Sequence, residues 1–173
     1  MVINVRLCSV LLLVTTCSTA STVTDTFTVS ATITNGCILG STTASTTQLG
    51  TIDFGTVGDL SSNVDVVSSS GAGSVVVTCT PGTAMSIALD YGLNGGTSSA
   101  RYLSNSTSSN KLAYQLYRDA SRSTVWGTGA LAYSIASFPA TTQTFPVYAR
   151  LLTSGTVPAA GTYNDTVTVT LTW

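Results

Sequence analysis

The sequence lacks two residue types on which enzymes commonly depend, since its 173 residues include no histidine and no glutamate. Without histidine there is no Ser-His-Asp triad, no HExxH metalloprotease site and little basis for a zinc site. The carboxylates are seven aspartates. Asp53, Asp59 and Asp65 lie in a Gly-, Ser- and Asn-rich region, where aspartate is an ordinary turn residue, and Asp90 and Asp165 are interpreted in the same way. The glycines are scattered, and none forms a phosphate-binding loop. We expect a protein that is not an enzyme and binds no cofactor or metal.

Charge is also scarce. Charged residues make up 8% of the chain, the formal net charge is −1, and no basic patch is present, which argues against nucleic acid as a partner. Abundant Thr, Ser, Gly and Val with few charges is typical of extracellular all-β proteins. The length suits one domain with a substantial core.

The first 20 residues have the layout of a secretory signal peptide. Arg6 precedes an apolar run over residues 7–14, and Ser18-Thr-Ala20 is a small-residue cleavage pattern. The apolar run is too short for a stable membrane anchor. Acylation at Cys17, as in a lipoprotein, and a buried N-terminal helix are the alternatives. Such a signal peptide predicts an exported protein.

Two cysteines remain after such processing, Cys37 and Cys79. In an oxidising compartment an isolated pair most simply forms one disulfide. A pair of free, reactive thiols is the alternative, although the separation of 42 positions fits no redox or zinc motif.

Alternating apolar and polar residues predict short β-strands along the whole mature chain. The first lies over Thr26–Thr34, where Phe27, Val29, Ala31 and Ile33 alternate with Thr and Ser. Further strands are expected over residues 49–57, 74–79, 85–91, 111–119, 144–152 and 165–173. Pro146, in the strand over residues 144–152, indicates that this strand lies at the edge of its sheet. The segment 111–120 also fits a helix, and residues 94–110 are interpreted as a long surface excursion. Seven or so strands of this kind predict a single antiparallel β-sandwich.

Several motifs then carry a resemblance. The strand that ends in "TNGC", followed by "LGTIDFGTV", "VVVTC", "YQLYRDASRSTVWG" and "GTYNDTVTVTLTW", resembles the spore coat protein U domain family. Within it, the chain is similar to the single-domain subunits of archaic, Csu-type chaperone–usher pili. The resemblance covers essentially the whole mature chain. It implies an immunoglobulin-like sandwich that lacks its last strand and is completed by a donor strand.

The resemblance also implies roles for particular residues. Residues 21–36 would be an N-terminal donor strand segment that inserts Phe27, Val29, Ala31 and Ile33 into the next subunit. Residues 37–173 would be the pilin domain, with an acceptor groove edge and chaperone contact formed by Val167, Val169, Leu171 and Trp173. The implied partners are like subunits in a homo-polymer, a periplasmic chaperone and an outer-membrane usher. The implied function is a surface pilus that supports adhesion and biofilm formation.

Two other interpretations stay open at this point. Thr26–Thr34 could be the first strand of a closed sandwich that packs on its own sheet. The protein could then be a self-contained secreted coat protein or a carbohydrate-binding module, with Tyr91, Tyr102 and Trp126 beside polar loops as candidate sugar contacts.

Overall fold

The computed structural model describes residues 22–40, 49–140, 142–155 and 157–173. The chain divides into two units, residues 1–32 and residues 33–173. The signal peptide predicted over residues 1–20 lies outside the described residues.

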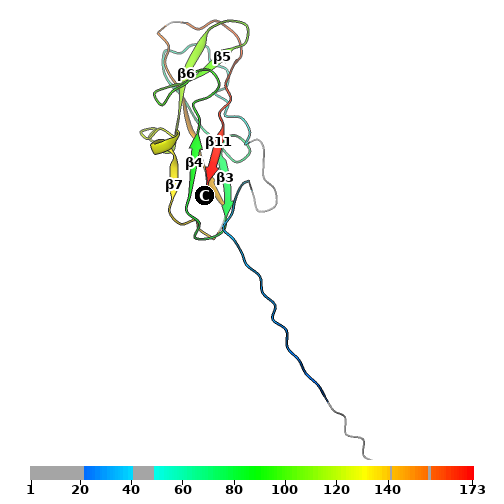
Figure 1. Cartoon of the computed structure of the whole chain (residues 1–173). Coiled ribbons are helices and arrows are strands. Elements are labelled where there is room, and N and C mark those ends of the chain that lie inside the picture. Colours follow the sequence, from blue (N-terminus) through cyan, green and yellow to red (C-terminus); the bar gives the residue numbers. More distant parts are fainter. Residues whose placement is uncertain (1–21, 41–48, 141, 156) are drawn as a thin grey trace, which may run out of the picture. The chain divides into compact units, whose positions relative to one another are not determined.

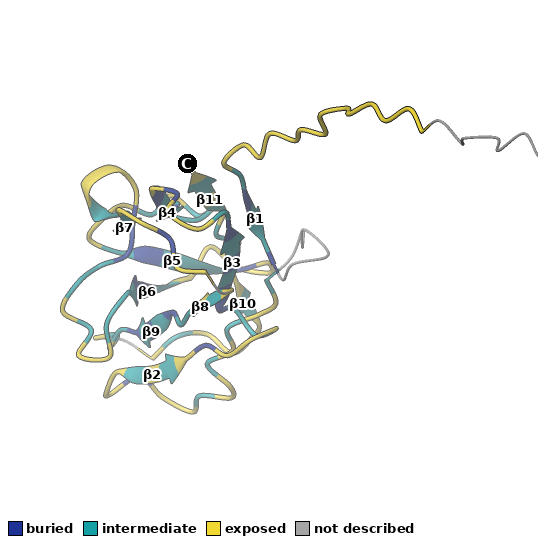
Figure 2. Ribbon diagram, turned by 90° about the horizontal axis from the view of Figure 1, so that it is seen from below, coloured by how far each residue is buried: buried dark blue, intermediate teal, exposed yellow. Residues whose placement is uncertain are grey.

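In the first unit, the described residues 22–32 have no regular secondary structure. The strand predicted over Thr26–Thr34 is therefore wrong for this structure. Phe27 and Val29 are 88% and 83% exposed, and the exposed segment is yellow in Figure 2. An alternating sequence favours a strand only where a second strand supplies hydrogen-bonding partners, because a single strand makes no ladder within itself.

The second unit is an antiparallel β-sandwich, as predicted, and its described residues contain no α-helix (Figure 1). Three sheets have the strand orders β1-β3-β8, β10-β5-β6-β9-β2 and β11-β4-β7. The strands are β1 Cys37–Leu39, β2 Val64–Val67, β3 Val75–Cys79, β4 Met85–Leu89, β5 Arg101–Asn105, β6 Lys111–Tyr117, β7 Tyr133–Ile135, β8 Gln143–Phe145, β9 Tyr148–Leu151, β10 Tyr163–Asn164 and β11 Val169–Thr172.

The core is built by the alternating strands that the sequence predicts. In β3 and β4 every second residue is buried, and the opposite positions are half-buried. The fully buried side chains of these strands include Val75, Val77 and Ile87, and Ala149 of β9 is equally enclosed. Burying each large aliphatic side chain contributes about 1.5–3 kcal/mol, so this core supplies most of the driving force for folding.

The predicted strand over residues 144–152 is split in two at Pro146. Before the proline, β8 is the outer strand of its sheet, as the proline indicates; after it, β9 lies between β6 and β2 in another sheet. The buried Val147 amide, which joins the two strands, donates to the hydroxyl of Ser68 at 2.7 Å. A chain that changes sheets at a proline keeps its apolar face on the core while it exchanges pairing partners.

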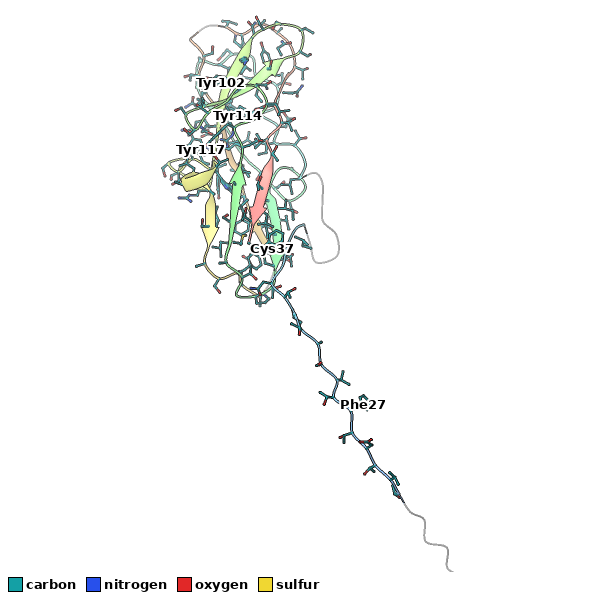
Figure 3. All side chains as sticks on the ribbon, in the orientation of Figure 1. Phe27, Cys37, Tyr102, Tyr114 and Tyr117 are labelled. Atoms are coloured by element: carbon teal, nitrogen blue, oxygen red, sulfur yellow. A yellow bond between two sulfur atoms is a disulfide. The ribbon has the colours of Figure 1, made fainter. Side chains whose placement is uncertain are left out.

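Two further expectations from the sequence are wrong. Residues 49–57 form no strand, although their apolar residues do pack against the core. The supposed surface excursion contains β5, and its first residue, Arg101, is completely buried. Figure 3 labels Tyr102 of β5 and Tyr114 of β6; across this pair Tyr102 is opposite Ala113, and Tyr114 is opposite Arg101.

Arg101 is held by acceptors that are not carboxylates. Its guanidinium donates to the carbonyls of Asp90 at 2.9 Å and Trp126 at 2.7 Å, and to the side-chain oxygen of Gln115. Gln115 is itself buried and donates to the Ser98 carbonyl. Buried polar groups need such partners, and here they tie the end of β4 to the strands beside it.

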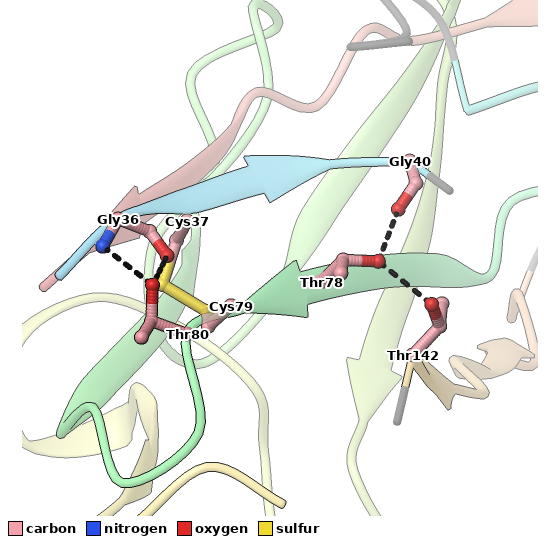
Figure 4. The surroundings of a disulfide bond; sticks show 7 residues. All are labelled: Gly36, Cys37, Gly40, Thr78, Cys79, Thr80 and Thr142. Carbon is pink, nitrogen blue, oxygen red and sulfur yellow. Dashed lines mark hydrogen bonds between the residues drawn. A yellow bond between two sulfur atoms is a disulfide. The ribbon is translucent and has the colours of Figure 1, made fainter. Parts of the chain in front are cut away.

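The predicted disulfide is confirmed. Cys37 and Cys79 are directly opposite in the β1–β3 pair and are bonded to one another (Figure 4). The Thr80 amide donates to the Gly36 carbonyl at 2.9 Å, and the Gly36 amide donates to the Thr80 hydroxyl at 3.2 Å. The bridge and these bonds fix the point at which the chain enters the sandwich.

Replacing both Cys37 and Cys79 with serine should lower the free energy of unfolding by about 4 kcal/mol, because the unfolded chain regains the entropy of a loop of roughly 40 residues. Urea unfolding monitored by circular dichroism measures the change. Wild-type protein unfolded under reducing conditions is the control and should match the variant. Free thiols in unreduced mature protein, or a loss below about 1 kcal/mol, would contradict the prediction.

Candidate functional site

The second unit contains a groove of about 550 Å³ lined mostly by apolar side chains. Its lining side chains come from β1, β3, β4, β5, β6 and β11 and from the loops between strands. The apolar ones are Leu39, Leu49, Ile52, Phe54, Val75, Leu89, Leu103, Tyr114, Leu116, Val147, Val167 and Val169. A soluble domain seldom leaves so many core-type side chains around one opening unless something binds there.

One wall of the groove is β11, which pairs with β4 and has no partner on its other edge within the part of the chain that the structure describes. The Thr168 carbonyl accepts from the Asp90 amide, whereas the Leu89 amide donates elsewhere, to Gly127. Thr168 and Asp90 are thus a hydrogen-bonded pair, and Val169 and Leu89 are not. Bonded and non-bonded pairs alternate along an antiparallel ladder, so Thr170 and Thr172 are the next residues of β11 that bond to β4. The N–H and C=O groups of Val169 and Leu171 therefore point to the free edge.

The side chains of β11 alternate as predicted. Val169 and Leu171 are half-buried against the core, and Thr170 and Thr172 are exposed. The same residues that face the core thus also present their backbone groups to the unpaired edge, which is the geometry of a strand able to accept a neighbour.

Asp90 anchors the start of this wall. One of its carboxylate oxygens accepts from the Thr168 amide at 2.9 Å and from the Gly92 amide at 3.0 Å. Burial disfavours the charged form of Asp90, but these amides and the positive charge of Arg101 outweigh it and lower the pKa of Asp90 below its usual value.

The other wall includes residues 49–57, the segment wrongly predicted as a strand. Ile52 and Phe54 point to the core, and the Phe54 ring meets the Tyr114 ring edge-on at 6.3 Å between centroids. Gly73, with a φ of +89°, leaves room for Ile52, because a Cβ there would stand 2.2 Å from an Ile52 carbon. Among the described residues, the only backbone hydrogen bond of residues 51–57 runs from Gly55 to the Asp53 carboxylate.

Asp165 is a charged residue among the mostly apolar residues that line the groove. Its carboxylate accepts from the Tyr114 hydroxyl at 2.7 Å, the Leu93 amide at 2.9 Å and the Asn94 side chain at 3.0 Å. Burial and the bond to Asp165 raise the pKa of Tyr114 well above its usual value, so the hydroxyl remains a donor. Asp165 was expected to be an ordinary turn residue, and nothing in the sequence indicates that it holds Tyr114.

The structure places the predicted acceptor residues as follows. Val167 and Val169 line the groove, and Leu171 packs on the core farther along the same face of β11. Trp173 is 58% exposed at the end of the chain. Of the predicted donor residues, Phe27, Val29 and Ala31 belong to the first unit, and Ile33, at the start of the second, is 87% exposed.

The described residues offer no sign of metal chemistry or of a membrane span. No three Cys or Asp side chains gather where they would hold an ion within the ranges that the structure describes. No helix in those same ranges has the length and apolar character needed to cross a bilayer.

Comparisons with known proteins agree on one family and one fold. The family described as Spore Coat Protein U domain matches residues 23–170. "Protein U" of Myxococcus xanthus is 35% identical over 133 residues, which are 72% of this chain and 72% of that protein.

Among solved structures, a chain of the CsuC–CsuE chaperone–tip adhesion subunit pre-assembly complex from archaic chaperone–usher Csu pili of Acinetobacter baumannii has a similar fold. The TM-score is 0.54 at 20% sequence identity, and the match covers 82% of this chain. The chain spans 41% of the length of that solved chain.

Replacing Asp90 with asparagine tests the anchor of β11. Since the pKa of Asp90 is lower in the folded than in the unfolded state, its charge contributes stability above the unfolded value of about 3.9, and this is lost as the pH falls through the folded value. Asparagine still accepts hydrogen bonds but carries no charge. In urea unfolding the variant should be about 1 kcal/mol less stable at pH 7, and the difference should shrink as the pH is lowered toward 2. An equal difference at both pH values would contradict this role.

Proposed function

Because the chain belongs to the spore coat protein U domain family, we propose that it is an exported structural subunit of a chaperone–usher surface pilus, which polymerises by donor-strand complementation. The observation that carries the proposal is the apolar groove whose wall, β11, has an unpaired edge. The fibre supports adhesion and biofilm formation and performs no chemistry of its own.

In this proposal, residues 21–36 of one subunit form the donor strand for the groove of the next. The apolar positions Phe27, Val29, Ala31 and Ile33 recur every second residue, as do Val167, Val169, Leu171 and Trp173 on the acceptor side. Each set of four spans six residue steps, about 20 Å of extended chain. The donor and the wall it would join therefore match in length and in period. The family match also includes most of the donor segment, since it begins at residue 23.

Burial and backbone pairing supply the binding energy. Three large apolar side chains, Phe27, Val29 and Ile33, contribute an upper bound of roughly 5–9 kcal/mol before the cost of ordering the segment. Ala31 contributes little and leaves space at its position. The free N–H and C=O groups of Val169 and Leu171 bond to the donor backbone, and the unpaired backbone of residues 51–57 offers a second edge. A slip of one residue would turn the donor threonines inward, so the pattern also sets the register.

A chaperone covers the groove before assembly. An uncovered apolar edge invites aggregation, and a sandwich of non-local strand pairs folds slowly enough to be exposed to that hazard. We propose that a periplasmic chaperone lays a strand along β11, with a basic side chain on the Trp173 carboxylate. The solved relative is, by its description, a chaperone–adhesion subunit complex, which supports this partner. An outer-membrane usher then exchanges the chaperone for the donor of the next subunit.

The signal peptide predicted over residues 1–20 directs this route through the periplasm to the cell surface. A self-contained coat protein remains the second candidate, because the family description itself refers to a spore coat. The two functions differ in whether residues 21–34 are needed for assembly or for folding.

Deleting Ser21–Thr34 from the mature chain should leave a subunit that folds and binds its chaperone but passes no strand to a neighbour. Co-expression with the chaperone, followed by electrophoresis of unheated samples, should show the complex and no ladder of polymers. Wild-type subunit is the control and should form the ladder. A truncated chain that fails to fold even with chaperone would make the segment an internal strand and contradict the proposal.

Charges placed on the two faces of β11 test the groove itself. Val169→Asp and Leu171→Asp each put a carboxylate on the apolar face and should reduce recovery in a chaperone pull-down at least tenfold. Thr170→Asp and Thr172→Asp are the matched controls, because their side chains are exposed, and recovery should fall less than twofold. Equal loss from both faces would refute the register, and normal recovery of the first pair would refute the groove.

A further inference from the structure

A second cavity, of about 290 Å³, shares no lining residue with the groove. It lies where β7 and β8 are the outer strands of their sheets. Its lining residues are Arg118, Trp126, Tyr133, Thr144, Phe145 and Pro146. It is separate from the groove that the proposed donor strand would fill.

Three aromatic rings in contact form its walls. The centroid of Tyr133 is 5.9 Å from that of Trp126 and 5.3 Å from that of Phe145. Trp126 is almost wholly buried and donates its indole N–H to the Ile87 carbonyl at 2.9 Å, which fixes its ring. Tyr133 and Phe145 are half-buried and so retain open surface. The cavity is thus lined by aromatic rings, of which the innermost, Trp126, is fixed by its hydrogen bond.

The guanidinium of Arg118 lies over this aromatic wall, 5.9 Å from the Tyr133 ring centroid. It donates one hydrogen bond, to the Ala132 carbonyl at 3.3 Å, and has no carboxylate partner among the described residues. The adjacent Asp119 does not serve, because its carboxylate accepts from Ser121, Ser123 and Thr124. Several guanidinium donors of Arg118 are therefore available to a ligand.

These features select a ligand class. An arginine with free donors favours a carboxylate, which it can bind through two parallel hydrogen bonds. A simple inorganic anion would gain nothing from the aromatic walls, whereas the C–H face of a sugar ring packs on them and the Thr144 hydroxyl can bond to sugar hydroxyls. A volume of about 290 Å³ is just below the range for small-molecule sites, roughly 300–1,000 Å³, so the cavity has room for a single ring.

We propose that this cavity binds a single uronic acid unit of an acidic polysaccharide, with its carboxylate on Arg118 and its ring against Tyr133 and Phe145. One unit binds weakly, with a dissociation constant on the order of 1 mM. The site does not depend on the proposed polymerisation. In a fibre, however, it would recur in every subunit, so many weak sites would hold one long polysaccharide by avidity.

The test titrates the purified mature protein, in the form in which it is isolated, with trigalacturonic acid and follows ligand signals by saturation-transfer difference NMR. The methyl ester of the same trisaccharide, which has the same rings without the charge, should bind at least tenfold more weakly to wild type. This comparison needs no variant. Equal binding of the acid and the ester would overturn the proposal.

Two charge-matched variants complete the experiment. Arg118→Gln should weaken trigalacturonate binding at least tenfold, while Lys111→Gln should change it less than twofold. Lys111 is the matched control because its ammonium also lies over a tyrosine ring, that of Tyr102 at 5.8 Å, and it too has no ion pair among the described residues. Equal effects of the two variants would overturn the site. Tighter binding of an aspartate-containing tripeptide than of the trisaccharide would show that the cavity recognises protein carboxylates, and would overturn the ligand class.

Discussion

The free edge of β11 is the constraint on which the rest of the structure depends. Val169 and Leu171 turn their side chains to the core and, in the ladder with β4, their backbone N–H and C=O groups to the side without a partner. Backbone groups that are shielded from water and unpaired are costly, and so is an apolar groove open to water. A second strand along this edge would pair these groups and cover the groove, so the proposed polymerisation would follow from the incompleteness of the fold.

The remaining polar and covalent features keep the two walls of the groove in place. The Asp90 carboxylate accepts from the amide of Thr168, the residue before β11. The Arg101 guanidinium donates to the carbonyls of both Asp90 and Trp126 and so links these two segments. Asp165 fixes Tyr114, whose ring meets Phe54 on the opposite wall. The disulfide fastens β1 to β3. A groove with fixed walls binds an incoming strand without first ordering itself, which is how preorganisation improves affinity.

Alternation in the sequence predicted which side chains face the core, but not which backbones are paired. It identified β3, β4, β6 and β11, and export context predicted the disulfide. It also predicted strands over Thr26–Thr34 and residues 49–57, and neither segment is paired in a ladder. A strand needs a second strand beside it to form hydrogen bonds, and the sequence of one segment does not show whether such a strand is there. β5 was missed because its buried ends are Arg101 and Asn105, polar residues that lie in a Ser- and Asn-rich stretch. The role of Asp165 was invisible because a turn aspartate and a buried acceptor look the same in sequence.

The central claim is that a second copy of the chain supplies the strand beside β11. Solid-state NMR of fibres assembled from an equal mixture of ¹³C-labelled and ¹⁵N-labelled subunits measures this directly, because a cross-peak between the two labels joins different chains. The account predicts cross-peaks from the amide nitrogens of Val169 and Leu171 to carbonyl carbons of residues 26–34. Fibres that form without any such cross-peak would contradict it.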